Sequence, residues 1–300
     1  MRSQLNNAID LLRSGDPARV GEAIQLLQQT VYAFSMKVCG HREDAEDTMQ
    51  DVLISSLPHL AKIENPRALA VWLYTVTRNR CWRTRRKESG GNAKALSLEE
   101  LMPDNAELQR VLQDGAANPE QQVLRGEKDL LLHQAVLSLP TRYRIVLVLH
   151  DMESLDTAQV AQVLGLQPGT VRVRLHRARL GVRKAMAQLL NGMASVNPGE
   201  KVHPQSARQR LKQSPVSRSS GCREIFANLS EYLDDRLDAG ACEEMREHIL
   251  ACPACVAFLR ELSAAIDRCR NFEPSCDRDV ATRLGKLLTT EYLRLIGHPV

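Results

Sequence analysis

The residues best suited to chemistry lie near the end of the chain, in the stretch HILACPACV that begins at His248. His248 and Cys252 are spaced i, i+4, so a helix would direct both side chains to one face. Cys255 follows after a turn that contains Pro253. Imidazole and thiolate groups are typical ligands of a structural zinc ion, which holds four of them in a tetrahedron. The spacing therefore predicts one zinc ion.

A fourth ligand must come from another part of the chain. Cys222 is the best candidate because it opens the preceding helix, and Cys242 is its rival. A closed set of four ligands leaves no open position for a substrate, so the cluster argues against an enzyme. A redox pair of cysteines is the alternative interpretation. The expected ligands are Cys222, His248, Cys252 and Cys255.

Composition narrows the class of protein. Aromatic residues make up 4% of the chain, which favours helices packed through Leu, Val and Ala over β-sandwiches. The N-terminal stretch has no apolar core of signal-peptide length, and no uncharged apolar run approaches about 18 residues. We therefore expect a cytoplasmic protein without a membrane segment. In that reducing compartment the eight cysteines favour metal ligands or buried thiols over disulfides.

Apolar spacing is helical in several blocks, with no strand alternation, so the fold class is all-α. Breaks in this pattern, marked by Gly, Pro and Ser, separate the blocks. The predicted segments are a first helical domain (1–88), a linker (89–118), a second helical domain (119–192), a flexible linker (193–221), a small helical zinc-binding domain (222–272) and a tail (273–300). In the tail we expect an amphipathic helix from Asp277 to Ile296. Its apolar stripe would be Val280, Leu284, Leu287 and Leu288.

The stretch SLDTAQVAQVLGLQPGTVRVRLHRARLGVRKAM carries the signals of a helix-turn-helix in order. Asp156 can cap a short helix, with Gln159 three residues on as in a capping box. Gly165 suits the left-handed position after that helix, and Pro168 suits the first position of the next. The apolar side of the first helix would be Ala158, Val160, Ala161 and Leu164, and the buried stripe of the second Val171, Leu175, Ala178 and Val182.

The second helix of this pair is strongly basic. From Thr157 to Ser195 there are six Lys or Arg residues and no acidic residue, a balance that indicates attraction to phosphates. An ordinary charged surface helix, the alternative, usually mixes both signs. We expect an outward face able to read base edges, made of Arg172, Val173, His176 and Arg177. The arginines better placed for phosphates are Arg174, Arg179 and Arg183.

The first domain contains an acidic helix. Five acidic residues crowd its start: Glu43, Asp44, Glu46, Asp47 and Asp51. Acidic groups complement a helix dipole, which is the structural alternative, but five exceed what capping needs. Asp47 and Asp51 lie one turn apart beside Gln50, and this face suits a basic partner helix. The apolar face of the same helix would be Ala45, Met49, Val52 and Leu53.

The helix after it, VWLYTVTRNRCWRTRRK, combines aromatic and basic residues. Trp72 and Tyr74 precede a basic stripe that begins with Arg78, Asn79 and Arg80. Aromatic rings beside positive charge are typical of surfaces that bind opened or single-stranded DNA. For Trp72 taken alone, burial in the core is the better interpretation.

These motifs together resemble the extracytoplasmic-function sigma factors of bacterial RNA polymerase. The resemblance lies in EDAEDTMQDVLISSL, WLYTVTRNR, LSLPTRYRIVLVLHDMESLDTAQVAQVLG and GTVRVRLHRAR, which occur in the family's order over about residues 20–190. Arg83 and Val173 depart from it, since the family commonly has Asp and Ser at these positions. The departures concern the promoter sequence that is read.

The resemblance implies a non-catalytic subunit that lends promoter specificity to RNA polymerase. Asp47, Gln50 and Asp51 would bind the polymerase core. The loop near 63–67 and the residues around Arg78 and Asn79 would recognise and help melt the −10 element. The helix-turn-helix would read the −35 element of promoter DNA. The alternative is a DNA-binding regulator that never joins polymerase, with the zinc domain as a protein-interaction or redox-sensing module.

Residues 222–272 resemble the zinc-binding anti-sigma domain, a small helical bundle that binds a sigma factor and blocks its surfaces. This segment has six basic and ten acidic residues, opposite in sign to the DNA-reading helix. We therefore expect intramolecular contact between the zinc domain and the sigma modules, with regulation as its purpose. An assisting role, or binding to another protein, remains an alternative.

Overall fold

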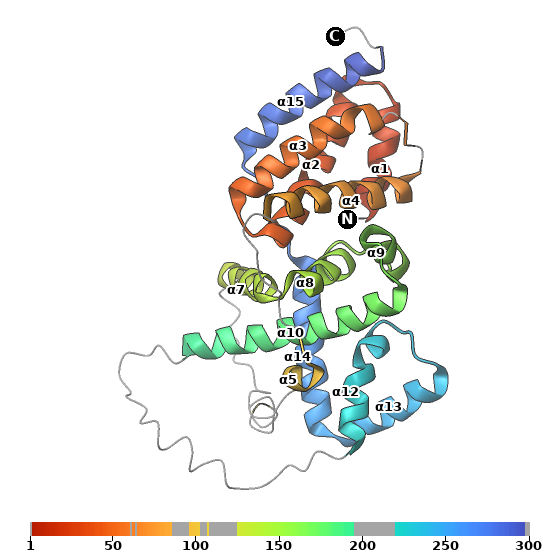
Figure 1. Cartoon of the computed structure of the whole chain (residues 1–300), viewed down its shortest axis with the longest axis vertical. Helices are drawn as coiled ribbons and strands as arrows, with labels where there is room; N and C mark the ends of the chain where they lie inside the picture. The colour runs from red at the N-terminus through yellow and green to blue at the C-terminus, as the bar shows by residue number, and fades with distance from the viewer. Residues whose placement is uncertain are drawn as a thin grey trace. The chain divides into compact units, whose positions relative to one another are not determined.

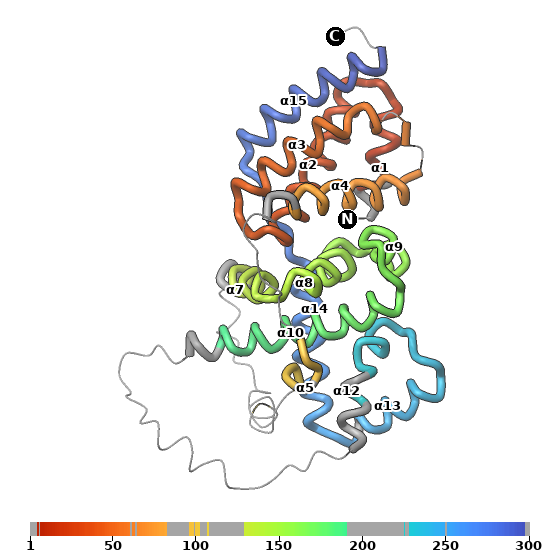
Figure 2. Tube along the Cα trace, viewed as in Figure 1, coloured from red at the N-terminus to blue at the C-terminus, as the bar shows by residue number. Residues whose placement is uncertain are grey.

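The computed structural model describes residues 2–60, 62–63, 65–85, 96–102, 107, 125–194 and 220–297. Within these ranges the secondary structure is helical without a strand, which confirms the all-α class (Figures 1 and 2). The chain forms two compact units. Unit 1 comprises Met1–Lys94, Pro140–Val171 and Arg270–Val300, and unit 2 comprises Ala95–Leu139 and Arg172–Cys269. These units cut across the predicted domain boundaries, which stay predictions.

Unit 1 is built around a long central helix. Its elements are α1 (Arg2–Arg13), α2 (Pro17–Cys39), α3 (Arg42–Leu60), α4 (Pro66–Arg85), α8 (Thr141–Leu147), the π-helical turn η2 (Val148–Met152), α9 (Thr157–Leu164) and α15 (Arg278–Leu295). Helix α2 begins after the cap Asp16 and ends at Gly40, which adopts the left-handed conformation that glycine tolerates best. It contacts α1, α3, α4 and α15, so the core of unit 1 forms around it.

The acidic helix was predicted correctly on its apolar side. Ala45, Met49, Val52 and Leu53 are all buried in α3. The charged side of α3 therefore faces outward, as the i, i+4, i+7, i+8 spacing requires.

The predicted C-terminal helix is α15, capped by Asp277, whose side chain accepts from the backbone of Asp279 and Val280. It packs on α2 and α3. Leu284 and Leu288 are buried, but Leu287 is 58% exposed, so the predicted stripe was wrong at that position. Tyr292 and Leu293 complete the buried side instead, because the helix continues its contact toward its C-terminal end.

The helix-turn-helix signals are confirmed in detail. Asp156 and Gln159 form a reciprocal capping box, and Gly165 is left-handed with φ of 64°. Helix α10 (Pro168–Ala194) begins at the predicted proline. The stripe from Val171 to Val182 is buried, whereas Ala158 is exposed and does not belong to the apolar side of α9.

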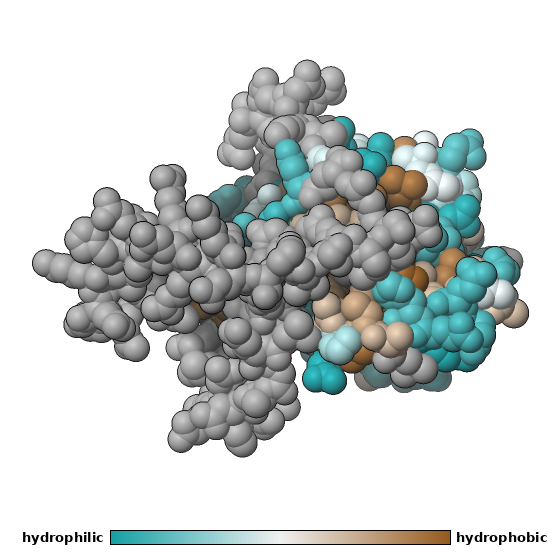
Figure 3. Space-filling model, turned by 90° about the horizontal axis from the view of Figure 1, so that it is seen from below, coloured by the Kyte–Doolittle hydropathy of each residue, from teal (hydrophilic) through white to brown (hydrophobic). Residues whose placement is uncertain are grey.

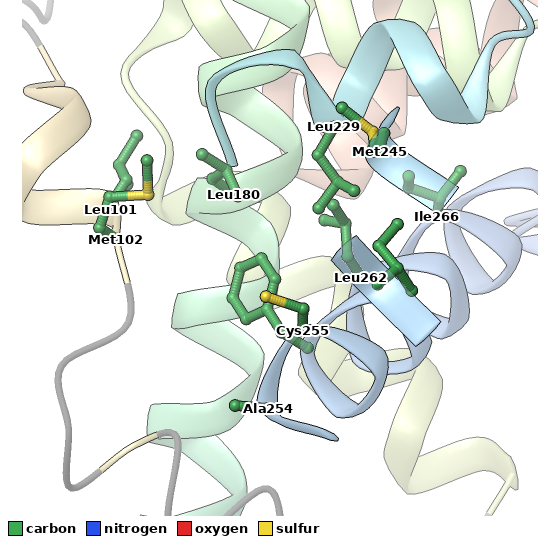
Figure 4. Close-up of a cluster of buried hydrophobic side chains, with 11 residues drawn as sticks. Leu101, Met102, Leu180, Leu229, Met245, Ala254, Cys255, Leu262 and Ile266 are labelled. Atoms are coloured by element: carbon green, nitrogen blue, oxygen red, sulfur yellow. The ribbon is translucent and has the colours of Figure 1, made fainter. Parts of the chain in front are cut away.

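Unit 2 joins most of α10 to the zinc domain. Its other elements are α5 (Leu98–Leu101), α7 (Arg125–Ser138), α12 (Ser220–Leu233), α13 (Ala239–Ala251) and α14 (Pro253–Asn271). Leu180 of α10 shares one buried cluster with Leu229, Leu262 and other residues of α12–α14 (Figure 4). The zinc domain thus has no separate core of its own, and the recognition helix supplies part of it.

The predicted linker 89–118 is not wholly irregular. It contains α5, and Leu101 and Met102 are buried in the same cluster (Figure 4). Short apolar segments between polar ones carry too little periodicity to be recognised in a sequence. Most other residues of this linker, and residues 195–219 of the predicted flexible linker, lie outside the described part of the chain.

No single helix among the described residues is long and apolar enough to cross a membrane. Two neighbouring helices, Ala239–Ile249 and Pro253–Asn271, meet the criterion only as a pair bent by 112°. The described residues on the face shown in Figure 3 are largely hydrophilic, with smaller apolar patches among them.

Candidate metal centre and DNA-recognition surface

The candidate metal centre lies at the corner between α13 and α14. His248 is in the last turn of α13, Cys252 is its C-cap in an extended conformation, and Cys255 is in the first turn of α14. One donor atom from each lies within 4.8 Å of the others. Cys255 Sγ is 3.4 Å from His248 Nε2. Two ligands of a tetrahedral zinc ion would be about 3.6 Å apart, given its bond lengths to sulfur and nitrogen. The three residues therefore fit a metal ion.

The fourth ligand is less completely defined. Cys222 lies in the first turn of α12, as predicted, but its side chain falls outside the described residues. Its rival Cys242 is half-buried in α13 and does not belong to the cluster of donor atoms. The described geometry thus brings together three of the four predicted ligands, and Cys222 as the fourth stays a prediction.

Helix α10 carries two distinct faces. The apolar stripe described above forms one of them. The second face repeats at i, i+4, i+7 and i+11 and consists of Arg172, His176, Arg179 and Arg183. In unit 2 this second face meets the zinc domain, and three of its four residues form ion pairs there.

Arg179 makes the strongest of these contacts. Its Nη1 and Nη2 donate to the two carboxylate oxygens of Asp234 at 3.0 and 2.8 Å. Nη1 also donates to Ser230 Oγ at 2.8 Å. The side chain of Arg179 has no exposed area. Bidentate, charge-assisted pairing of this kind is the geometry by which arginine binds carboxylates and phosphates.

Arg183 and Arg172 extend the contact along the helix. Arg183 donates to Glu261 at 3.1 Å and to Glu107 at 2.8 Å, and its guanidinium lies 4.4 Å from the ring centroid of Phe258. Arg172 is 3.8 Å from a carboxylate oxygen of Glu231 and is half-exposed, so its pair contributes little.

His176 corrects one prediction. We expected an outward face of Arg172, Val173, His176 and Arg177, but His176 is 9% exposed. Neither of its ring nitrogens has a hydrogen-bond partner among the described residues. Burial, together with the positive charges of Arg179 and Arg177, lowers the pKa of His176 to about 4. Val173 is 53% exposed, and Arg174 and Arg177 are half-buried.

In unit 1 the predicted polymerase-binding face is open to solvent. Asp47 and Gln50 are exposed, and Ile54 one turn further on is 44% exposed. Asp51 forms an ion pair with Arg80 of α4, one of the predicted DNA-binding residues.

The predicted −10 residues of α4 are partly engaged inside unit 1. Arg78 donates to the backbone carbonyl of Val163 in α9 and lies over the ring of Trp82, 5.0 Å from its centroid. Burial lowers the pKa of Arg78 from its ordinary value. Asn79 is exposed and accepts from Arg78. Trp72 is half-buried against His59, with ring centroids 5.6 Å apart.

Sequence reasoning missed the acidic partners of the basic helix. Ser230 comes from α12, Asp234 from the turn after it and Glu261 from α14, and no short-range signal marks them as contacts. The opposite net charges of the two segments were the one available indication. They predict that the segments attract each other, but they do not identify the residues in contact.

Comparisons with known proteins agree with this architecture. Residues 23–90 match the family "Sigma-70 region 2", residues 129–180 match "Sigma-70, region 4" and residues 222–255 match "Putative zinc-finger". The last match begins at Cys222 and ends at Cys255. Regions 2 and 4 in this order define a sigma-70-type factor, a non-enzymatic subunit of RNA polymerase that binds its core and promoter DNA.

Individual relatives narrow the class. The chain is 25% identical over 192 residues to "ECF RNA polymerase sigma factor SigW" of Bacillus subtilis, covering 63% of this chain and 100% of the relative. It is 25% identical to "RNA polymerase sigma-H factor" of Pseudomonas aeruginosa, covering 63% and 97%. It is 29% identical to "ECF RNA polymerase sigma factor SigE" of Mycolicibacterium smegmatis, covering 58% and 65%. The chain belongs to the ECF sigma factors and carries a zinc-finger domain after region 4.

Proposed function

We propose that this ECF sigma factor is held inactive by its own zinc domain, which covers the DNA-recognition helix α10. The observation that carries this proposal is the bidentate pair between Arg179 and Asp234, formed with no exposed area on the arginine. A carboxylate of the zinc domain occupies the position that a DNA phosphate would take. Helix α10 cannot offer Arg179 and Arg183 to DNA while they pair with acidic residues.

The remaining site residues have separate roles in this proposal. Asp47, Gln50 and Asp51 bind the polymerase core. Arg78, Asn79 and Arg80 contact the −10 element. The −35 element is read by α10 through Arg172, Val173, Arg174, His176, Arg177 and Arg179. A factor of this kind acts where polymerase and chromosome are, so we place it in the cytoplasm.

One zinc ion bound by Cys222, His248, Cys252 and Cys255 would support the covering contact. Three of these ligands join the end of α13 to the start of α14, and Cys222 would add α12 to the same centre. The metal would thereby hold α12, which Asp234 directly follows, at a fixed position relative to α14, which carries Glu261. Oxidation of two of these thiolates to a disulfide by an oxidant of the peroxide class, which takes up the two electrons, would remove ligands from the ion, and we propose that α10 is then released.

Transcription in vitro with core polymerase tests the proposed inhibition. We compare the full chain with a chain that ends at Asn191 and so lacks the zinc domain together with α15, which packs on α2 and α3. The shorter chain should give more transcript and bind promoter DNA more tightly. Equal activity and equal promoter affinity of the two chains would contradict inhibition by the zinc domain.

Binding to core polymerase tests the sigma assignment of the acidic face. Charge reversal by Asp47→Lys together with Asp51→Lys should abolish association with the core. Glu22→Lys, an equally exposed reversal on α2, is the matched control and should leave association unchanged. Unchanged association of the double variant would mean that this face does not bind polymerase.

A further inference from the structure

We propose a second inhibitory contact, inside unit 1, that joins region 4 directly to region 2. It consists of Lys37, Tyr74 and Glu153, and we call it the lock. Lys37 Nζ donates to Glu153 Oε1 at 2.8 Å, and the Tyr74 hydroxyl donates to Glu153 Oε2 at 2.6 Å. The side chains of Lys37 and Glu153 have no exposed area, and Tyr74 is 1% exposed. Lys37 and Tyr74 belong to α2 and α4 of region 2, whereas Glu153 is the C-cap of η2 in region 4.

Two further hydrogen bonds join other elements of region 4 to region 2. Arg144 of α8 is 6% exposed, and its Nη1 donates to the carbonyl of Val38 near the end of α2 at 2.6 Å. Arg78 of α4 donates to the carbonyl of Val163 in α9. Helices α8 and α9 and the turn η2 are thus each joined to region 2 by at least one polar contact.

The chemistry of the lock suits a contact that opens. A permanently closed interface gains most from apolar packing, because burying an ion pair costs desolvation that the attraction barely repays. Once regions 2 and 4 separate, Lys37 and Glu153 recover their hydration. The buried pair therefore holds the closed state specifically while keeping the opened surfaces compatible with water.

Closure conflicts with reading a promoter, and this step rests on the proposed function. The −10 and −35 elements lie about 25 base pairs apart, roughly 85 Å along B-form DNA at 3.4 Å per base pair. Arg78 cannot reach the −10 element while it is hydrogen-bonded to α9. Helix α9 belongs to the helix-turn-helix, which reads the −35 element. Regions 2 and 4 must therefore separate before both elements are bound.

This lock is independent of the zinc domain, because none of its residues lies between 222 and 272. Release of α10 from the zinc domain would leave Lys37, Tyr74 and Glu153 in place. Full activation then requires two events, the release of α10 and the opening of regions 2 and 4.

The experiment measures the distance between regions 2 and 4 in the full chain. Fluorescent labels are introduced through non-natural amino acids at Glu22 on α2 and Gln162 on α9, both exposed. Glu153→Gln and Lys37→Met each leave one partner buried without its countercharge. Each should shift the equilibrium toward the open form on the order of a hundredfold, seen as lost energy transfer. Glu243→Gln, which breaks an exposed ion pair on α13, is the matched control.

A variant that replaces the whole network separates opening from unfolding. The triple change Lys37→Met, Glu153→Met and Tyr74→Phe removes every polar group of the lock, so closure and energy transfer should return. Unchanged energy transfer in both single variants would overturn the lock, as would failure of the triple variant to restore it. Opening in the single variants without tighter promoter binding would leave the lock standing, because α10 stays paired with the zinc domain in them. If promoter binding also stays unchanged when Asp234→Asn is added to Glu153→Gln, the lock still stands and only the proposed function is contradicted.

Discussion

Arg179 of the recognition helix and Asp234 of the zinc domain form a two-pronged ion pair, with N–O distances of 3.0 and 2.8 Å. The guanidinium is fully buried and the carboxylate nearly so. Such a pair is weak evidence for stability but strong evidence for a specific contact, because neither charge can remain there without the other. The zinc domain and α10 are therefore joined through residues that we propose bind DNA.

Asp234→Asn should release the recognition helix. The change leaves the Arg179 charge buried without a countercharge, a situation that costs about 3–5 kcal/mol. Promoter affinity of the full chain should therefore rise at least about tenfold, measured by fluorescence anisotropy with a −35 duplex. Asp235→Asn is the control, since Asp235 is exposed and left-handed, a conformation that asparagine tolerates. An affinity that stays the same in Asp234→Asn would argue against the covering contact.

Metal content should follow the ligand set. Zinc per chain, measured by atomic emission on purified protein, should fall in Cys255→Ser because serine is a poor zinc ligand. Cys242→Ser should retain the full amount, since Cys242 lies outside the cluster. Cys222→Ser tests the fourth ligand and should behave like Cys255→Ser. Full retention of zinc in Cys222→Ser would exclude it from the set.

Local features of the fold were predictable from sequence, and the helix-turn-helix is the clearest case. The capping box of Asp156 and Gln159, the left-handed Gly165 and the leading Pro168 all depend on neighbours within a few residues. The cluster of His248, Cys252 and Cys255 was predictable for the same reason, since six residues separate the first from the last. Local chemistry over about two helical turns is sufficient in each case.

Features set by distant residues were not predictable. His176 was expected to face outward, yet it is buried in the described fold. The network of Lys37, Tyr74 and Glu153 joins residues up to 116 positions apart, and a lone lysine in α2 gives no sign of its partner. Helical periodicity indicates which residues share a face, but not what covers that face.

His176 should make stability depend on pH. Its pKa is about 4 in the folded chain because of burial and the charges of Arg179 and Arg177, whereas the unfolded chain binds the proton near 6.5. The contribution of neutral His176 to the free energy of unfolding is therefore complete above pH 6.5 and is lost as pH falls toward 4. Between pH 7 and 5 the free energy of unfolding should fall by about 2 kcal/mol more than in His176→Gln, measured with denaturant. An equal fall in both proteins would contradict the neutral, buried histidine.

The salt dependence of promoter binding should report how many arginines the zinc domain covers. Each arginine that neutralises a DNA phosphate releases about one counterion, so log Kd changes with log salt by about one more per contact. A chain ending at Asn191 frees Arg179 from Asp234, whereas Arg183 keeps its pair with Glu107, so its slope should be steeper than that of the full chain by about one. Arg179→Ala in this shorter chain should then remove about one from the slope. Equal slopes of the full and shorter chains would mean that the arginines facing the zinc domain do not bind DNA, even if truncation raises promoter affinity.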